Sequence, residues 1–242
     1  MLNLKTKIKR RTLKLISGLF LGGLIFFVSC QKSQDFDQKN IFRYNESNGV
    51  GSLDPAYSKD LATINVCEQL YNGLVQLDSN LKIQPSIAKK WQQSPDLLTY
   101  TFLLKDDVYF HINECFGEMK SRAVNARDFV YSFQRILNPA LSSPGLWIFS
   151  KVDTNWQSHG FYAPSDSVLQ IRLKEPYAPF ISLLSMKYCS VIPEEAVQYY
   201  GQEFRKNPVG TGPFRMKFWE EGLKLILEKN DNYFEKGWPL LD

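Results

Sequence analysis

The pattern that most constrains how this chain can fold lies in its last third. The run Asn207-Pro-Val-Gly-Thr-Gly-Pro-Phe214 is followed directly by two short stretches in which hydrophobic residues recur at every second position. Glycine and proline favour tight turns, and a period of two is typical of strands with one buried face. We therefore expect a β-hairpin that turns at residues 220–222 and pairs Phe214, Met216 and Phe218 with Leu223, Leu225 and Leu227.

Helices are expected at several places upstream of this hairpin. Apolar residues recur with a helical period over residues 61–74, and Asn125 can cap a helix that stops at Asn138-Pro139. Pro179 and Pro193 are expected in the first turns of two short helices, the second ending near Gly201. Trp91, Phe129 and Phe133 are expected in the hydrophobic core.

Strands are expected between these helices. A short strand is predicted over residues 41–45, a turn over 78–80, and strands with one buried face over 99–104 and 169–174. Because strands and helices interleave, the expected fold class is α/β (mixed α+β) and not a helical bundle.

Composition supports a folded globular protein and argues against a nucleic-acid partner. Of the 242 residues, 44% are hydrophobic and 14% aromatic, as expected for a globular protein. The net charge of +4 belongs to the N-terminus, because residues 1–29 hold six basic residues and no acidic one. The rest of the chain has 29 − 6 = 23 basic against 25 acidic residues, a net charge of −2, so no nucleic-acid partner is expected.

The N-terminus has the features of a signal peptide. The six basic residues precede an apolar run, residues 15–28, which is too short to span a bilayer and suits the hydrophobic region of a signal. Phe27-Val-Ser-Cys30 then resembles a lipobox, although Phe27 stands where leucine is usual, and it indicates lipidation at Cys30. We expect a lipoprotein signal over residues 1–29 and a polar tether over residues 30–40. An ordinary secretory signal is the alternative.

The remaining cysteines and histidines give little support for a metal site. Cys67, Cys115 and Cys189 lack C-x-x-C spacing, and the only histidines are His111 and His159. The cysteines are expected to act as small buried hydrophobic residues, with one disulfide pair as the alternative. No metal, cofactor or catalytic residue is expected.

Several segments beyond the hairpin carry a resemblance to a known family. They lie in order along the chain: Ser52-Leu-Asp-Pro55, Gln69-Leu-Tyr-Asn-Gly-Leu74, Pro85-Ser-Ile-Ala-Lys-Lys-Trp91, Thr99-Tyr-Thr-Phe-Leu-Leu104, Val108-Tyr-Phe-His111, Asn125-Ala-Arg-Asp-Phe-Val-Tyr-Ser132, the 207–214 turn, and a final stretch from Asn230 to Asp242. Together they resemble the bacterial extracellular solute-binding proteins of family 5, which serve peptide ABC importers. One departure is residues 112–124, which replace the family's short Asp-Gly turn with a longer loop.

The resemblance implies a fold and a function. It implies that residues 41–242 form the first lobe of a periplasmic-binding-protein fold, a mixed sheet with flanking helices and hairpins, with the chain stopping before a second lobe. It implies a non-enzymatic component of an ABC importer that captures peptides between its lobes and delivers them to permease subunits. With the signal, it implies an exported protein held to a membrane by its N-terminal lipid, facing the periplasm or the cell exterior.

The resemblance also suggests ligand contacts. Glu46, Ser47 and Asn48 stand where family members present polar groups to an extended peptide, with a solvated loop as the alternative. Further candidates are Tyr71, Tyr109 and Trp147 as cleft aromatics and Gly210, Thr211 and Gly212 as a source of backbone amides. For these residues the alternatives are a place in the core and a purely structural turn.

Other functions stay open from the sequence. The cargo could be another small solute, such as a chelated metal or a sugar derivative, and a truncated lobe could have no transport role. A secreted hydrolase is a third reading, although two histidines and no Gly-x-Ser-x-Gly motif weigh against it.

Overall fold

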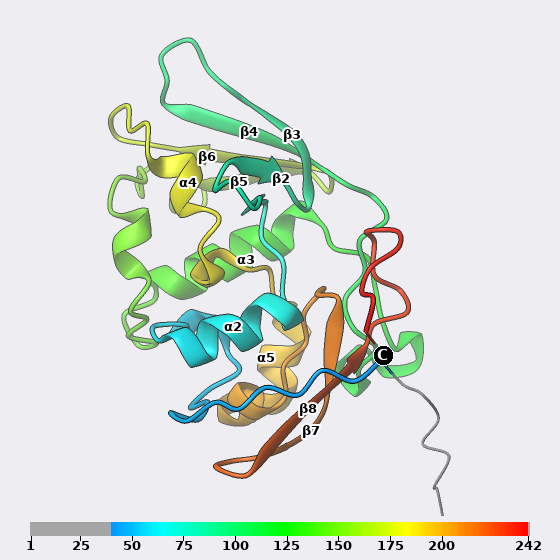
Figure 1. The fold of residues 1–242 in the computed structure, drawn as a ribbon. Helices are drawn as coiled ribbons and strands as arrows, with labels where there is room; N and C mark the ends of the chain where they lie inside the picture. The colour runs from blue at the N-terminus through cyan, green and yellow to red at the C-terminus, as the bar shows by residue number, and fades with distance from the viewer. Residues whose placement is uncertain (1–39, 242) are drawn as a thin grey trace, which may run out of the picture. The chain divides into compact units, whose positions relative to one another are not determined.

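The computed structural model describes residues 40–241, which contain short helices and antiparallel strands in alternation (Figure 1). The α- and 3-10 helices are η1 (Pro55–Tyr57), α2 (Leu61–Leu70), η2 (Glu114–Met119), α3 (Ala126–Leu137), η3 (Leu146–Phe149), α4 (Phe180–Leu183), η4 (Lys187–Cys189), α5 (Glu194–Tyr200) and η5 (Gly201–Lys206). The strands are β1 (Val75–Leu77), β2 (Ile83–Pro85), β3 (Ala88–Gln93), β4 (Thr99–Leu104), β5 (Phe161–Ser165), β6 (Val168–Arg172), β7 (Phe214–Glu220) and β8 (Lys224–Lys229). No helix in this part of the chain is long and apolar enough to cross a membrane.

The strands form one four-stranded sheet and two hairpins. The sheet has the order β3-β4-β6-β5, and the hairpins are β1-β2 and β7-β8. Helix α3 runs beneath the four-stranded sheet, with α2 and α5 on its other side and the β7-β8 hairpin beyond them (Figure 1). The α/β class is thus confirmed, although the ladders in residues 40–241 are antiparallel rather than mixed.

An aromatic cluster joins α3 to the sheet. The ring of Phe133 lies 5.0 Å from that of Phe149, 5.3 Å from Phe161 and 5.8 Å from Phe129. All four side chains are fully buried, and Trp91 packs at the edge of the same core. The predicted core positions Phe129 and Phe133 are confirmed, and Trp91 is partly buried.

Elements with strong local signals agree with their predictions. Helix α3 starts after Asn125, whose side chain accepts from the Arg127 N–H, while the Asp128 carboxylate accepts from the Asn125 N–H and completes a capping box. Strand β4 covers the predicted range 99–104, whereas β6 overlaps the predicted range 169–174 but ends at Arg172. Pro179 and Pro193 directly precede α4 and α5. Gly201, with φ of 54°, ends α5 as expected.

Two predictions near the N-terminus are wrong in part. Residues 41–45 form no strand, because no described strand pairs with them. Helix α2 ends at Leu70 rather than at residue 74, because Tyr71 turns into an extended conformation and its hydroxyl donates to the Leu53 carbonyl at 2.8 Å. The apolar residues after Leu70 are buried by tertiary packing outside the helix.

The β7-β8 hairpin forms with a different register from the one expected. A bulge between Met216 and Phe218 places Phe218 opposite Ile226 and leaves Phe214 opposite Lys229. Leu223 therefore lies in the turn, where it is largely exposed. Strands β1, β2, β3 and β5 were not predicted, since they are short or lack a clean alternation of apolar residues.

The three cysteines of the described chain are free. Cys67 and Cys189 are buried, as expected for small hydrophobic residues, and Cys115 is half-buried. Burial raises the pKa of Cys67 to about 12 and that of Cys115 to about 11, so both thiols stay protonated and unreactive near neutral pH.

Candidate functional site

The segment at residues 41–48 belongs to no helix or strand and is exposed except at the half-buried Glu46. Ile41, Phe42 and Tyr44 each show more than half of their surface to solvent. Within residues 40–241, no backbone group exchanges a hydrogen bond with the backbone of residues 41–47. The segment therefore offers main-chain donors and acceptors, together with apolar side chains, to a binding partner.

Glu46, Ser47 and Asn48 close this segment with a turn. The Glu46 carboxylate accepts from the Asn48 N–H at 3.1 Å and from the Tyr44 hydroxyl at 3.4 Å. Ser47 and Asn48 are exposed. Glu46 thus orders the turn, while the other two side chains remain accessible to a ligand.

Tyr109 and Trp147 lie elsewhere on the surface. Tyr109 is 47% exposed and forms an isolated antiparallel bridge with Ala123. Trp147 belongs to η3 and is 51% exposed. Among the described residues, no hydrogen bond or ring contact joins either aromatic to Glu46, Ser47 or Asn48.

The turn at residues 210–212 is buried against the end of α2. A Cβ atom on Gly210 would lie 2.0 Å from the Leu70 carbonyl oxygen, and one on Gly212 would lie 2.3 Å from the Gln69 carbonyl oxygen. Neither glycine has a positive φ. Close backbone packing, rather than a special φ angle, is therefore what requires glycine at both positions.

The polar groups of this turn are engaged inside the protein. The Gly212 N–H donates to the Leu70 carbonyl at 2.9 Å, and the Thr211 hydroxyl donates to the Asn72 side chain at 3.0 Å. Thr211 is 1% exposed and Tyr71 is 0% exposed. In this structure Tyr71, Gly210, Thr211 and Gly212 hold segments of the chain together, so ligand contact through them stays a prediction that a shift of the turn would have to allow.

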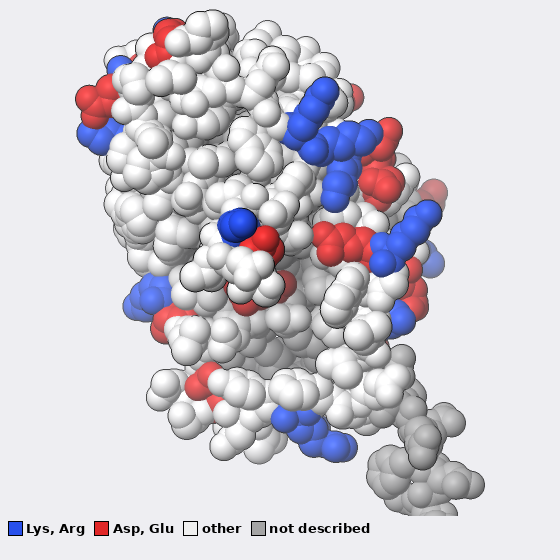
Figure 2. Space-filling view, turned by 45° about the horizontal axis from the view of Figure 1, so that its top comes forward, with Lys and Arg blue, Asp and Glu red and all other residues white. Residues whose placement is uncertain are grey.

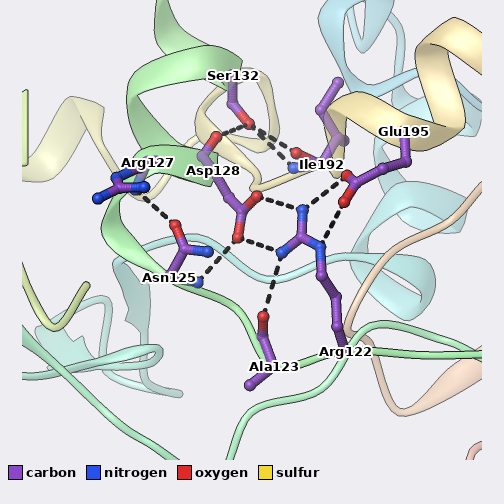
Figure 3. Close-up of polar contacts among 8 residues, drawn as sticks. All are labelled: Arg122, Ala123, Asn125, Arg127, Asp128, Ser132, Ile192 and Glu195. Atoms are coloured by element: carbon purple, nitrogen blue, oxygen red, sulfur yellow. Dashed lines mark hydrogen bonds and ion pairs between the residues drawn. The ribbon is translucent and has the colours of Figure 1, made fainter. Parts of the chain in front are cut away.

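Another junction involves Arg122, which sequence reasoning did not single out. Its guanidinium lies between the carboxylates of Asp128 on α3 and Glu195 on α5 (Figure 3). It donates to both Asp128 oxygens, at 2.7 and 2.9 Å, and to both Glu195 oxygens, at 2.6 and 2.7 Å. These hydrogen bonds hold the pKa of Glu195 below its usual range. Arg122 therefore ties α3 to α5.

A groove of about 1150 Å³ opens beside α3 and η5. Aromatic and aliphatic side chains contribute to its wall: Tyr57, Tyr131, Leu141, Val197 and Phe204. Asp54 and Arg135 also line it, and they form a nearly buried ion pair in which Arg135 donates to both carboxylate oxygens at 2.6 and 3.0 Å. Because these two charges neutralise each other, the pair offers no free charge to a ligand.

The surface charges of the described chain are mixed in sign. Lys and Arg side chains lie beside Asp and Glu side chains on the face that Figure 2 shows. On the β7-β8 hairpin, for example, Glu228 pairs with both Arg215 and Lys217. No group of His, Cys, Asp and Glu residues in the described part of the chain is arranged to hold a metal ion.

Comparison with known proteins assigns the fold to a family. The profile of the bacterial extracellular solute-binding proteins, family 5 (middle region), matches residues 82–242. The glutathione-binding protein GsiB of Pectobacterium atrosepticum is 30% identical over 191 residues, which are 79% of this chain and 34% of that protein. The chain belongs to the family 5 solute-binding proteins.

Solved structures of periplasmic binding proteins agree with this fold. DppA of Helicobacter pylori, a periplasmic binding protein in complex with the peptide STSA, matches with a TM-score of 0.68 and 30% identity over 77% of this chain and 38% of its own. AgaA of A. tumefaciens, in complex with agropinic acid, matches with a TM-score of 0.70 and 25% identity over 80% of this chain and 36% of its own. This chain thus spans little more than a third of the length of these relatives.

Proposed function

We propose that this chain forms one wall of a peptide-binding cleft in a solute-binding protein of an ABC importer. The observation that carries the proposal is the exposed segment at residues 41–48, in which the backbone of residues 41–47 exchanges no hydrogen bond with a backbone group of residues 40–241. An extended peptide can add alongside such a segment through main-chain hydrogen bonds, which accept any side chain. A second lobe would close over the ligand, and the closed form would dock on permease subunits.

The proposal also names the class of ligand that the cleft binds. A peptide is favoured because the segment presents main-chain groups, with Ser47 and Asn48 exposed at its end. The alternative is another small solute, such as a chelated metal or a sugar derivative. One similar protein, AgaA, was solved in complex with agropinic acid rather than with a peptide.

A titration followed by NMR tests the proposal. The full chain in detergent is titrated with a pool of di- to pentapeptides, and backbone amide shifts are recorded. We expect shifts centred on residues 41–48 and an affinity no tighter than roughly millimolar, because one wall supplies only part of the contacts while the entropic cost of association is undiminished. Tyr44→Pro, which removes one N–H donor, is expected to weaken these shifts.

The controls distinguish the alternatives. A sugar or a chelated metal that shifts residues 41–48, while peptides do not, supports the alternative cargo. Peptide-induced shifts confined to other segments, or none up to about 10 mM, would contradict the peptide proposal. A micromolar isotherm from the monomeric chain would contradict the partial-cleft part of it.

The anchor at Cys30 is a second part of the proposal and lies outside the described residues. Cys30→Ala is expected to abolish lipidation and leave a soluble or uncleaved form, because the thiol is the acylation site that the Phe27-Val-Ser-Cys30 pattern indicates. Intact-mass analysis of the membrane fraction checks this. A mass that retains Met1, or cleavage elsewhere without a diacylglycerol group, would contradict it.

A further inference from the structure

His111 is a buried histidine that bonds to one distant turn through its backbone and both ring nitrogens. Its N–H donates to the Gly210 carbonyl at 2.7 Å, and the Gly210 N–H donates back to its Nδ1 at 3.3 Å. Its Nε2 lies 3.0 Å from the Gly212 carbonyl oxygen. These hydrogen bonds set the position of the 210–212 turn.

The same turn also holds residues 230–235, which lie near the end of the described chain. The Gly212 carbonyl also accepts from the Asn230 side chain at 2.9 Å, and the Asn230 N–H donates to the Pro213 carbonyl at 2.9 Å. Beyond Asn230, the Tyr233 hydroxyl lies 3.4 Å from the Asn72 amide, and the Gln76 amide donates to Glu235 at 3.2 Å. Residues 230–235, here called the exit segment, are therefore fastened at their first residue, Asn230, by the turn that His111 holds. Further along the segment, the Lys105 ammonium lies 4.6 Å from the Phe234 ring, so the segment is also held by contacts outside the turn.

Only one protonation state of His111 satisfies this arrangement. Nδ1 must accept from the Gly210 N–H, and Nε2 must donate to the Gly212 carbonyl, so the ring is neutral with its proton on Nε2. A proton added to Nδ1 would face the Gly210 N–H, leaving two donors opposed. The ring, the turn or both would then have to move.

We propose that His111 is a positioning residue that holds the 210–212 turn, and through it the exit segment, only while its ring is neutral, so that protonation releases the exit segment before the core opens. The proposal concerns how residues 230–235 are held to the body and does not depend on the cargo proposed above. It gives the Gly210-Thr-Gly212 turn a structural role, whereas contact of this turn with a ligand stays a prediction.

The electrostatic surroundings agree with this assignment. Burial of the ring, reinforced by the positive charge of Arg215 on β7, lowers the pKa of His111 to about 4. Glu228 on β8 pairs with both Arg215 and Lys217 of β7. The remaining ionisable groups of these elements are Glu220 on β7, Lys224 and Lys229 on β8, and Asp231, Tyr233 and Glu235 of the exit segment. In the described chain His111 accepts no hydrogen bond from, and donates none to, a carboxylate.

The pKa sets the direction of the pH dependence. An exposed histidine titrates near 6.5, so a released His111 takes up a proton as the pH falls below about 6.5, while the bound one does so only near 4. The neutral state thus stabilises the fastening fully above about pH 6.5, and this stabilisation is lost as the pH falls toward 4. The opening equilibrium is expected to rise about tenfold per pH unit across this window, or roughly 300-fold in all.

Hydrogen exchange of the full chain in detergent, corrected for intrinsic rates between pH 7 and pH 4, measures this opening. We expect the amides of residues 230–235 to exchange faster than those of β4 at every pH and to show the tenfold dependence. His111→Gln, which has no titrating ring, is expected to lose that dependence. His159→Gln, which replaces the one other histidine at an exposed position, is expected to retain it.

A second measurement needs no substitution. Nitrogen NMR of protein labelled at its two histidines is expected to show the Nε2–H tautomer for His111 and a midpoint near pH 4 that coincides with shift changes in residues 230–235. Three results would overturn the proposal: an Nδ1–H tautomer, equal exchange of β4 and residues 230–235 at every pH, or a tenfold dependence that persists in His111→Gln. Equal exchange would mean that His111 contributes to global stability alone.

Discussion

Phe133→Ala is expected to lower the free energy of unfolding by about 3–5 kcal/mol, the range for truncating a buried phenylalanine. The ring is fully buried and lies within 5.8 Å of three other phenylalanine rings. Its removal forfeits the transfer free energy of the ring and leaves a cavity between α3 and the sheet. In thermal unfolding this corresponds to a fall in Tm of roughly 10 °C.

An exposed phenylalanine provides the matched control. Phe42 is 72% exposed, so Phe42→Ala is expected to change the free energy of unfolding by no more than about 0.5 kcal/mol. Calorimetry or urea titration of the two variants beside the unchanged chain makes the comparison. Equal midpoints for both variants would show that Phe133 does not face the core, and the helix face assigned to α3 would be wrong.

Local chemistry explains why some elements were predictable. The start of α3 depends on Asn125 and Asp128, which are three residues apart and form the capping box between themselves. Strand β4 alternates buried and half-buried residues over its whole length, so its period is visible without knowledge of the partner strands. Such signals lie within one helix or strand and do not depend on which other elements pack against it.

Other features depend on contacts that no local pattern contains. Residues 41–45 have the composition of a strand, but a strand needs a partner, and no described strand pairs with them. The bulge at Met216 and Phe218 changes the register of β7 without breaking its alternation visibly in the sequence. The sequence therefore predicted the hairpin but placed Leu223 in a strand, where the structure has it in the turn.

The candidate site divides in the same way. The polar triplet from Glu46 to Asn48 was proposed from the family resemblance, at the end of a strand that the structure does not form, and its contact with a ligand stays a prediction. The roles of His111 and Asn230 could not be foreseen, because each bonds to a turn far away along the chain. In the sequence, His111 was noted only as the last residue of the Val108-Tyr-Phe-His111 segment, which says nothing of its partners.

The sequence offered a structural turn as one interpretation of the motif glycines, but it did not show why the turn needs glycine. A glycine in a turn suggests a positive φ, which alanine tolerates poorly. Gly210 and Gly212 have no such angle, and instead the end of α2 passes so close that a methyl group has no room. A positive φ and close packing predict different effects when alanine replaces glycine. A Cβ atom that clashes with a backbone carbonyl cannot be accommodated by rotating a neighbouring side chain.

Gly210→Ala is therefore expected to lower the free energy of unfolding by about 3 kcal/mol or more, at or above the upper end of the range for overpacking. The added Cβ would lie 2.0 Å from the Leu70 carbonyl oxygen, so either α2 or the turn must shift. A shift of the turn would also disturb the two hydrogen bonds that the Gly210 backbone makes with His111, one to its N–H and one to its ring Nδ1, so the effect should reach residues 230–235.

Gly51→Ala is the matched control for this substitution. Gly51 has no atom within 4 Å of an added Cβ and no positive φ, so alanine there is expected to leave stability unchanged or raise it by up to about 1 kcal/mol. Thermal unfolding of both variants measures the difference, and hydrogen exchange of residues 230–235 locates it. A Gly210→Ala protein as stable as Gly51→Ala would show that α2 does not pack directly on the turn. Because the exit segment is fastened through that turn, the same result would also remove the structural basis for the role assigned to His111.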